Sequence, residues 1–470
     1  MVKNRTERLY DAGILQDRDA DYVRTSFERD RERLVHTRSL RRLAGVTQVV
    51  NAAEGQVFHN RLTHTLKVAQ IARRLGARLL RVENPRLINK LGGLDVDVVE
   101  AAALAHDLGH PPFGHTGEDQ LHTLVREQGA DGYEGNAQSF RIVNKLEVRW
   151  TGFGGLNLTR ATLNALLKYP WTRAQQPENS ARKKEKWGAY SSERWELDWV
   201  RRGSDHLRQS LEASIMDWAD DIAYAIHDMD DFYRAGLIPL DHLVTEATIQ
   251  INYSGSDTWE RSRFLEAVTD WRKGDGVDYT PDKIIHTFDT LLSLFPLSQP
   301  YRAAREQERT LQIVIEQLIN RYIKAVTLNP DAVDDASLPL LCIPIELVRE
   351  VKILKDLTRY YVINSRALGT QQYGEKQIIQ FLFACYMEEA LALKRSRGKV
   401  VQSILPSDFD TLIHEAEEYA EKRGDGYSDD VQRRARVVAD VISRMTDDQA
   451  LRMHQRLSGT QPGSLADLLA

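Results

Sequence analysis

Residues 105–118 read A-H-D-L-G-H-P-P-F-G-H-T-G-E and place three histidines, an aspartate and a glutamate close together in the chain. The apolar residues before this stretch predict a helix, and the glycine and the two adjacent prolines within it predict where the helix ends. His106 and Asp107 are therefore expected at the C-terminal end of a helix. His115 and Glu118 are expected to follow after a rigid turn.

The neighbouring side chains of His106 and Asp107 offer one nitrogen and one oxygen ligand to a single ion. No cysteine lies in this stretch, so no sulfur ligand selects the metal. A mixed site of this kind suits a divalent ion such as Mn, Mg, Fe, Ni, Co or Zn. Two ligands make a weak site, and we therefore expect further ligands from other parts of the chain.

Two other segments carry candidate ligands. His64 lies in R-L-T-H-T-L, on an amphipathic helix predicted over residues 61–81. Residues 216–231 read M-D-W-A-D-D-I-A-Y-A-I-H-D-M-D-D. On a helix, one face of this segment presents Asp217, Asp220, Asp221, Tyr224 and Asp228. A row of carboxylates among apolar residues is costly to bury unless something neutralises it, and a bound cation is the simplest candidate.

Helical periodicity dominates the chain, and few runs alternate in the manner of a strand, so the predicted fold class is mainly α. Helices are predicted over residues 61–81, 98–108, 211–232, 310–326, 346–360, 376–395, 406–422 and 429–446, with a short terminal helix within 458–470. A small hairpin is predicted around Gly55, from residues 48–52 and 56–59. Residues 171–195 are polar and charged and are interpreted as a long surface loop or lid. Residues 253–280, rich in Gly, Ser and Asp, also interrupt the helical pattern.

Composition narrows the class of protein. Of the 470 residues, 42% are hydrophobic and 28% are charged, as in ordinary globular proteins. The net charge of -5 excludes a strong overall attraction to nucleic acid, although local basic patches are compatible with it. No apolar run reaches about 18 residues and the N-terminus lacks the apolar segment of a signal peptide, so we expect a cytoplasmic protein without membrane spans. Cys342 and Cys385 lie in apolar runs and are expected to be buried thiols in a reducing compartment.

Six stretches, in order along the chain, resemble one family. They are R-T-S-F-E-R-D-R-E-R-L-V-H-T-R-S-L-R-R-L (24–43), T-Q-V-V (47–50), H-N-R-L-T-H-T-L (59–66), the stretch at 105–118, Y-E-G-N-A-Q-S-F-R (133–141) and A-D-D-I-A-Y-A-I-H-D-M-D-D (219–231). The pattern is that of the HD superfamily, and its details resemble the deoxyguanosine triphosphate triphosphohydrolase (dGTPase or dNTPase) family. The resemblance implies an HD-domain helical core with an additional helical C-terminal part. We expect an N-terminal segment at 1–23, an HD phosphohydrolase core at 24–236, and a helical region at 237–470 that completes the site or an oligomer interface.

The resemblance also implies roles for individual residues. The implied metal ligands are His64, His106, Asp107 and Asp220. The implied catalytic pair is His115 and Glu118, in which a histidine held by a carboxylate moves a proton. The implied substrate contacts are Arg61 and His110 at the phosphates, Tyr224 and Asp228 at the sugar, and Gln48 and Val49 at the base.

The implied activity is metal-dependent hydrolysis of a deoxynucleoside triphosphate (dGTP or several dNTPs) to the deoxynucleoside and inorganic tripolyphosphate. Members of this family form homo-oligomers, often hexamers or tetramers, and some are activated by a second dNTP. Two alternatives stay open: another HD phosphohydrolase, such as a 5′-nucleotidase or an alarmone hydrolase, and a non-catalytic nucleotide sensor or single-strand nucleic-acid binder. The chain lacks G-x-x-x-x-G-K-[ST], which excludes a P-loop NTPase.

Two basic clusters have more than one interpretation. Arg38, Arg41 and Arg42 share one helix face, where they stabilise the packing of that helix, bind a regulatory nucleotide or anchor a subunit contact. The run R-K-K-E-K at 182–186 is interpreted as solvated surface, with a nucleotide- or DNA-facing role as the alternative.

Overall fold

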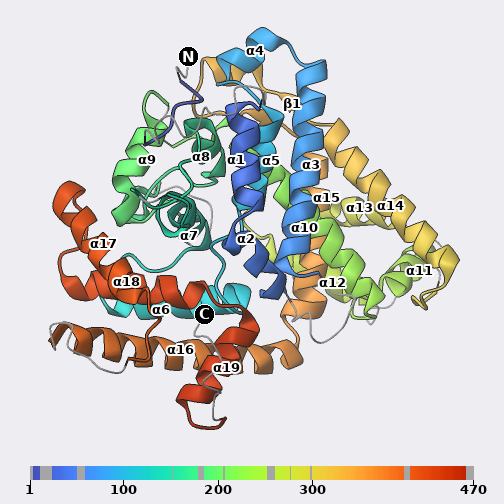
Figure 1. Cartoon of the computed structure of the whole chain (residues 1–470). Helices are drawn as coiled ribbons and strands as arrows, with labels where there is room; N and C mark the ends of the chain where they lie inside the picture. The colour runs from blue at the N-terminus through green and yellow to red at the C-terminus, as the bar shows by residue number, and fades with distance from the viewer. Residues whose placement is uncertain are drawn as a thin grey trace.

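The computed structural model describes residues 4–10, 24–49, 59–150, 152–177, 185–204, 207–250, 260–275, 277–296, 299–395 and 403–461. Helices account for almost all of their regular structure, which confirms the mainly α class (Figure 1). These helices are α1 (Ser26–Val35), α2 (Arg38–Arg42), α3 (Arg61–Val82), α4 (Pro85–Lys90), α5 (Val96–Ala105), α6 (Gly114–Glu127), α7 (Gly135–Arg141), α8 (Arg160–Leu166), α9 (Arg194–Arg201), α10 (Leu211–Arg234), α11 (Leu240–Gln250), α12 (Glu260–Trp271), α13 (Pro281–Leu292), α14 (Arg305–Lys324), α15 (Ile345–Thr358), α16 (Arg366–Arg395), α17 (Phe409–Arg423), α18 (Asp430–Ser443) and α19 (Asp447–Leu457). Two short strands, β1 (Thr327–Leu328) and β2 (Leu341–Cys342), pair antiparallel with Thr327 opposite Cys342.

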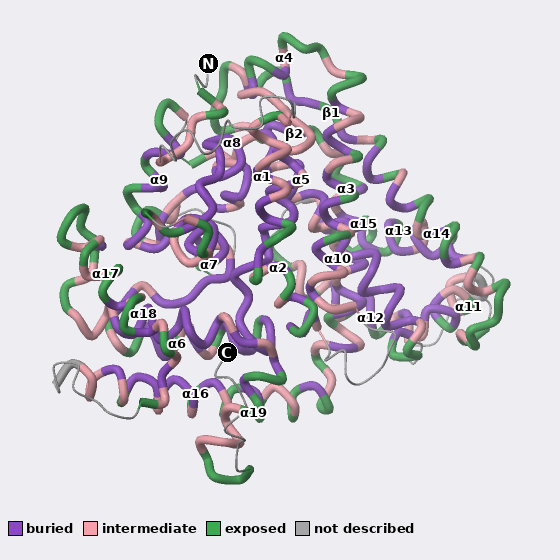
Figure 2. The backbone as a smooth tube through the Cα atoms, viewed as in Figure 1, coloured by how far each residue is buried: buried purple, intermediate pink, exposed green. Residues whose placement is uncertain are grey.

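The helices α3, α5 and α10 pack against one another and form the centre of the main core. Val68, Ala102 and Ile222 are fully buried members of this core, one from each helix. The alanine run of α5 leaves room for its neighbours, because small side chains let helix axes approach closely. Figure 2 shows that buried residues run along the lengths of these helices. The contact brings the first turn of α3 and the end of α5 beside α10, where the candidate ligands lie.

Local capping signals determine where two of these helices begin. The side chain of Asn60 accepts a hydrogen bond of 3.0 Å from the backbone N–H of Thr63, and Ser210 accepts one of 3.1 Å from Ala213. Asn and Ser are favoured at this position because they satisfy backbone donors that the first helical turn leaves free. The observed helices therefore agree closely with those predicted over 61–81 and 211–232.

The turn between α5 and α6 has an unusual backbone. Phe113 has φ of 64° and Gly114 has φ of 56°, so two successive residues are left-handed at the start of α6. Gly109 lies so close to the next segment that an added Cβ would be 2.1 Å from the carbonyl oxygen of Gly135. A side chain at Gly109 would therefore separate this turn from α7.

The C-terminal helices form a second core around α6. Phe113, Leu121 and Tyr133 share this core with apolar residues of α16 and α18, among them Leu382 and Val438. Figure 1 shows α16, α17, α18 and α19 gathered around α6. The main core also includes helices on both sides of residue 236, because α14 and α15 pack against α10. The proposed division of the chain at that residue stays a prediction.

Three expectations about local structure were wrong. The segment 253–280 contains α12, which forms because Phe264 and Val268 are buried on one face despite the polar composition around them. Cys342 is exposed because the short strand β2 turns Leu341 inward and Cys342 outward, and Cys385, on α16, is only partly buried. None of the helices predicted from the sequence includes α19, which begins at a Thr446 capping box.

The segment predicted as a surface loop at 171–195 is only partly so. Trp187 and Tyr190 are buried, and a short 3-10 turn at Ser191–Glu193 leads directly into α9. Burial of Trp187 and Tyr190 places this part of the segment in the interior. The many charged residues around them led to the interpretation as a surface loop. Residues 178–184 lie outside the described structure.

Two further predictions fall on residues that are incompletely described. Residues 50–58, the greater part of the expected hairpin, lie outside the described structure, and an antiparallel bridge joins Thr47 to Asn60 on its two sides. Residues 458–461 are turns and bends, and the remainder of the predicted terminal helix lies outside the described residues. Within the described chain, every helix is too short or too polar to span a membrane.

Candidate active site

The four predicted metal ligands converge from three parts of the chain. His64 lies in the first turn of α3, His106 and Asp107 follow the end of α5, and Asp220 lies on α10. Oδ1 of Asp220 is 3.2 Å from Nε2 of His64 and 3.6 Å from Nε2 of His106. Oδ1 of Asp107 is 3.5 Å from Nε2 of His106. His64, His106 and Asp107 offer two imidazole nitrogens and a carboxylate oxygen within 4.8 Å of one another, and Asp220 approaches both histidines, which suits a divalent metal.

The hydrogen bonding of His106 fits a metal ligand. Its Nδ1 is 2.6 Å from the carbonyl oxygen of Ala103, and a carbonyl oxygen only accepts, so Nδ1 carries the proton. The lone pair of the neutral ring is then on Nε2, which is buried and has no hydrogen-bond partner among the described residues. A second partner that fixes the tautomer in this way is typical of metal-binding histidines.

The negative charges of Asp107 and Asp220 favour a positive charge at His106. Burial lowers the pKa of His106, but the charges of Asp107 and Asp220 outweigh it and raise the pKa to about 9. In the metal-free protein His106 therefore takes a second proton, on Nε2. This proton lies between the two carboxylates, at the position where a metal cation would bind. Burial opposes ionisation of Asp220, yet Lys168 and the two histidines hold its pKa well below the usual range.

Arg61 and His110 lie on the other side of Asp107. Nη1 of Arg61 is 2.9 Å from Oδ2 of Asp107, and Nε of Arg61 donates to the carbonyl oxygen of Thr47 at 3.0 Å. Nη2 of Arg61 is buried and has no partner in the described structure. Nδ1 of His110 lies 3.0 Å from Oδ1 of Asp107. Burial and the charge of Arg61 lower the pKa of His110 to about 4, so His110 is neutral near pH 7.

His115 and Glu118 form the predicted pair within the first turn of α6. Nδ1 of His115 is 2.9 Å from Oε2 of Glu118, while the side chain of His115 is 58% exposed. Oε1 of Glu118 accepts from the backbone N–H of Gly135 and from Nζ of Lys186, each at 3.1 Å. Although burial raises the pKa of Glu118, Lys186 and His115 hold it well below the ordinary value. Glu118 is therefore ionised beside an imidazole that solvent and substrate can reach.

Two lysines neutralise most of the acidic face of α10. Nζ of Lys168 is 2.6 Å from Asp217 and 3.0 Å from Oδ2 of Asp220, and Nζ of Lys355 is 2.6 Å from Asp221. A bound cation, which the sequence suggested as the neutralising charge, is therefore not the only one available to this face. These lysines are distant in sequence from α10, so helical spacing could not reveal them. Asp220 is the carboxylate of this face that also points at the two histidines.

The predicted sugar and base contacts are also placed by the structure. Tyr224 lies on α10 with Nζ of Lys355 5.1 Å from its ring centroid. Asp228 is 4% exposed, and its Oδ2 has no partner among the described residues. Burial and the neighbouring Asp231 raise the pKa of Asp228 well above its ordinary value. Gln48 is buried with an unpartnered Oε1, and Val49 packs partly buried against the main core.

The basic clusters have clearer roles in the structure. Arg38 and Arg41 are exposed, whereas Arg42 donates to the carbonyl oxygens of Leu108 and His110 at 2.8 and 2.7 Å. The interpretation of Arg42 as a packing residue is therefore the one its contacts support. Lys186 was interpreted as solvated surface, but it is largely buried, because it bridges Glu118 and Glu134.

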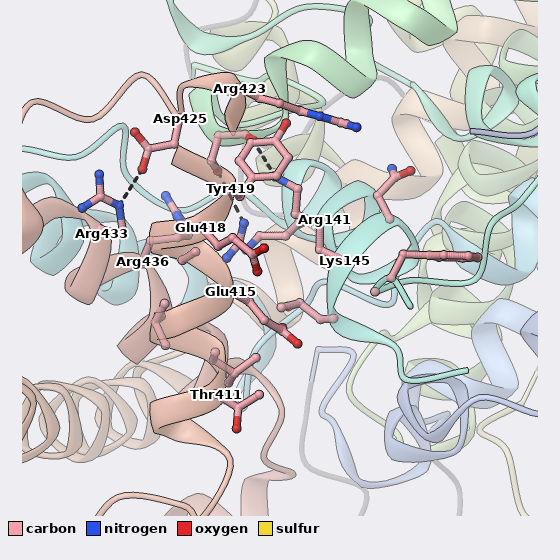
Figure 3. A pocket seen from close by; sticks show the side chains of 18 of the residues that line it. Arg141, Lys145, Thr411, Glu415, Glu418, Tyr419, Arg423, Asp425, Arg433 and Arg436 are labelled. Carbon is pink, nitrogen blue, oxygen red and sulfur yellow. Dashed lines mark hydrogen bonds and ion pairs between the residues drawn. The ribbon is translucent and has the colours of Figure 1, made fainter. Parts of the chain in front are cut away.

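A separate cavity of about 520 Å³ lies between α17, α18 and the residues that follow α7 (Figure 3). None of the predicted site residues lines it. Two of its cations are paired with carboxylates, Arg433 with Asp425 and Arg444 with Asp408, each at 2.7 Å. Another, Arg423, lies over the rings of Trp195 and Tyr419.

Comparison with known proteins agrees with this site. The HD domain family model matches residues 61–225, and the phosphohydrolase-associated domain model matches residues 341–456. A deoxyguanosinetriphosphate triphosphohydrolase-like protein from Streptomyces coelicolor is 35% identical over 449 residues, which cover 93% of this chain and 93% of that protein. Proteins of the same description from Corynebacterium efficiens and Shewanella halifaxensis are 34% and 30% identical, over 93% and 95% of this chain and 92% and 94% of their own lengths.

These matches define an HD-domain phosphohydrolase, a class of metal-dependent hydrolases. Within that class, the chain belongs to the deoxyguanosinetriphosphate triphosphohydrolase-like family.

Proposed function

We propose that this protein hydrolyses deoxynucleoside triphosphates, dGTP or several dNTPs, to the deoxynucleoside and inorganic tripolyphosphate. The observation that carries the proposal is the convergence of His64, Asp107 and Asp220 around the unpartnered Nε2 of His106. The relatives are named deoxyguanosinetriphosphate triphosphohydrolase-like proteins, which indicates the substrate class, and the neighbouring cationic and sugar-side residues are compatible with it.

The metal ligands in this proposal are His64, His106, Asp107 and Asp220. The donor set of two nitrogens and two carboxylates is compatible with Mn, Mg, Fe, Ni, Co or Zn. When bound, the ion would polarise a phosphoryl oxygen and lower the pKa of a water molecule.

The chain's own acid/base work falls to His115. Water attacks the α-phosphorus, a new P–O bond forms while the water gives up a proton to the solvent, and the bond from phosphorus to the 5′ oxygen breaks. His115 gives a proton to that oxygen, so the nucleoside leaves as a neutral alcohol. The ionised Glu118, 2.9 Å from Nδ1, orients the imidazole and stabilises its charged form.

The phosphate chain carries several negative charges, and cations surround its proposed position. Nη2 of Arg61 is available for a phosphate oxygen, and His110 is close by as a neutral donor. Lys186 adds a positive charge beside Glu118. Charge neutralisation and positioning of this kind do most of the work in phosphoryl transfer.

The deoxyribose contacts in this proposal are Tyr224 and Asp228, and the base contacts are Gln48 and Val49. A tyrosine ring packed under the sugar leaves no room for a 2′ hydroxyl. The raised pKa of Asp228 favours its protonated form, and a protonated carboxyl group both donates to and accepts from a 3′ hydroxyl.

The family resemblance further supports a cytoplasmic homo-oligomer, a hexamer or a tetramer, with a second dNTP as activator. Light scattering after size exclusion measures the oligomer. Turnover of each dNTP in the presence of the other three measures the activation.

A product assay tests the function. The protein, loaded with each metal in turn, is incubated with each dNTP, and the products are separated by ion-exchange chromatography. Deoxynucleoside and tripolyphosphate in equal amounts are expected. Release of monophosphate or pyrophosphate would instead indicate another HD phosphohydrolase. No turnover with any metal or dNTP mixture, together with tight nucleotide binding, would indicate a sensor.

A further inference from the structure

Asp447 joins two sides of the candidate active site. Its Oδ1 accepts a hydrogen bond of 2.7 Å from the backbone N–H of Phe113, in the turn that begins α6. Its Oδ2 accepts from the backbone N–H and the hydroxyl of Thr47, at 2.9 and 2.5 Å. Each carboxylate oxygen thus holds a different segment, and all three residues are buried.

The two segments are those that the proposed reaction must align. Phe113 directly precedes α6, which carries His115 and Glu118. Thr47 precedes Gln48, and its carbonyl oxygen accepts from Nε of Arg61. The carboxylate of Asp447 therefore sets the distance between the segment of Thr47 and Gln48, which holds a proposed base contact, and α6, which carries His115 and Glu118.

Asp447 is not needed to begin its own helix. Thr446 is the N-cap of α19, and Gln449 completes the capping box by accepting from the backbone N–H of Thr446 at 2.8 Å. The side chain of Asp447 takes no part in this capping box and instead points toward Phe113, in the turn between α5 and α6. Asp448, next to it in the same first turn, is exposed and pairs with Arg452.

Neighbouring contacts reinforce this joint. Arg42 donates to the carbonyl oxygen of Met445 at 3.1 Å, and its other nitrogen binds the carbonyl oxygens of the catalytic turn. Gly45 lies so close to Thr446 that an added Cβ would be 2.8 Å from its methyl carbon. The segment 445–447 therefore packs directly against the turn between α5 and α6 and against the residues from Gly45 to Thr47.

We propose that Asp447 is a positioning residue for the reaction, through which the C-terminal region sets the geometry of the active site. It acts through Phe113 and Thr47 and does not touch the substrate. The inference rests on the proposed function, because the segments that it aligns are the proposed base contact and the proposed acid/base pair.

The first test compares Asp447→Asn with Asp448→Asn. An asparagine offers a single acceptor oxygen, and its NH2 group would face a second donor, so one of the two segments loses its hold. We expect kcat/KM for the preferred dNTP to fall about 10- to 100-fold in Asp447→Asn, with the metal content retained. The ratio of kcat/KM between the best and worst bases should also fall. Asp448→Asn loses the same charge from the same helical turn and should change neither quantity.

A second variant removes part of the same link. Thr47→Val loses the hydroxyl bond to Oδ2 but keeps the backbone bond, so its loss of kcat/KM should be smaller than that of Asp447→Asn. The double variant should be no worse than Asp447→Asn alone, because both changes act on one link. Wild-type kcat/KM and wild-type base discrimination in Asp447→Asn would overturn the inference. So would a lowered melting temperature with unchanged kinetics well below it.

Hydrogen exchange separates this inference from the proposed function. Peptides that contain the amides of Phe113 and Thr47 should exchange at least about tenfold faster in Asp447→Asn than in Asp448→Asn, with no substrate present. If the wild-type protein hydrolyses no dNTP, the proposed function fails while this exchange difference still reports the joint. If exchange at both amides is unchanged, the joint itself is refuted whatever the enzyme hydrolyses.

Discussion

Two buried clusters of charged side chains differ in one respect that separates function from structure. Around Arg141, the guanidinium donates to both oxygens of Asp440 and to Glu193, so its Nε, Nη1 and Nη2 all have partners. Around His106, Nε2 has no hydrogen-bond partner among the described residues, although Oδ1 of Asp107 and Oδ1 of Asp220 lie 3.5 and 3.6 Å from it. Buried polar groups are normally satisfied by the protein itself, so a cluster that is left incomplete marks a place for a ligand.

The largest expected effect comes from the incomplete cluster. His106→Ala removes the central nitrogen ligand, and we expect activity to fall on the order of 10⁴-fold with loss of bound metal. Steady-state kinetics and metal analysis measure both, and circular dichroism should show an intact fold. Asp217→Asn is the matched control, since Asp217 shares Lys168 with Asp220 but is not among the proposed ligands, and it should cost at most about tenfold. A His106→Ala protein that stays active and binds metal would show that the cluster around His106 is not the metal site.

The cluster around Arg141, whose guanidinium nitrogens are all paired although Oε2 of Glu193 has no partner among the described residues, should respond in stability. Arg141→Met leaves Asp440 buried without its main partner and Glu193 with Lys145 alone, and we expect the free energy of unfolding to fall by about 3–5 kcal/mol. Urea denaturation measures this loss. Arg194→Met breaks the half-exposed pair with Asp198 and should cost about 0–1 kcal/mol. Equal effects of the two substitutions would show that burial does not distinguish these pairs.

The smallest effect concerns pH. Burial raises the pKa of Glu193, but Lys145 and Arg141 outweigh it and lower the pKa to about 2 in the folded protein. Because the folded pKa lies below the unfolded value of about 4.3, Glu193 stabilises the fold fully above that value. This stabilisation is lost as the pH falls from there toward 2. Glu193→Gln should therefore lose stability relative to wild type at pH 7, and the difference should shrink as the pH falls below 4. A difference that is constant from pH 7 to pH 3 would assign the effect to packing instead of charge.

Local patterns allowed much of the central fold to be predicted. The beginnings of α3 and α10 were predictable because Asn60 and Ser210 are strong capping residues in front of periodic apolar runs. The resemblance led to His64, His106, Asp107 and Asp220, and the structure places their ligand atoms together. Their roles as ligands stay predictions until metal binding is measured.

The partners of these residues could not be predicted, because each lies far away in sequence. Lys186 is separated from Glu118 by 68 residues, and Asp447 is separated from Phe113 by 334. A single lysine or aspartate in a polar segment carries no periodicity that points to its partner. The helix α12 was missed for a different reason. Its few buried apolar residues lie among many charged residues, and that composition favours the interpretation as a loop.

The joint at Asp447 bears on how the protein is made. Met445 contacts Arg42 over a separation of 403 residues, and Asp447 contacts Phe113 and Thr47 over separations of 334 and 400 residues. A chain emerging from the ribosome therefore carries the proposed acid/base pair and the proposed base contacts long before Asp447, which aligns them, has been synthesised. Contacts of such separation form late, because a long loop must be closed first. On the proposed function, a chain in which α19 has not yet docked would hold its metal ligands but would turn over substrate less efficiently than the folded protein.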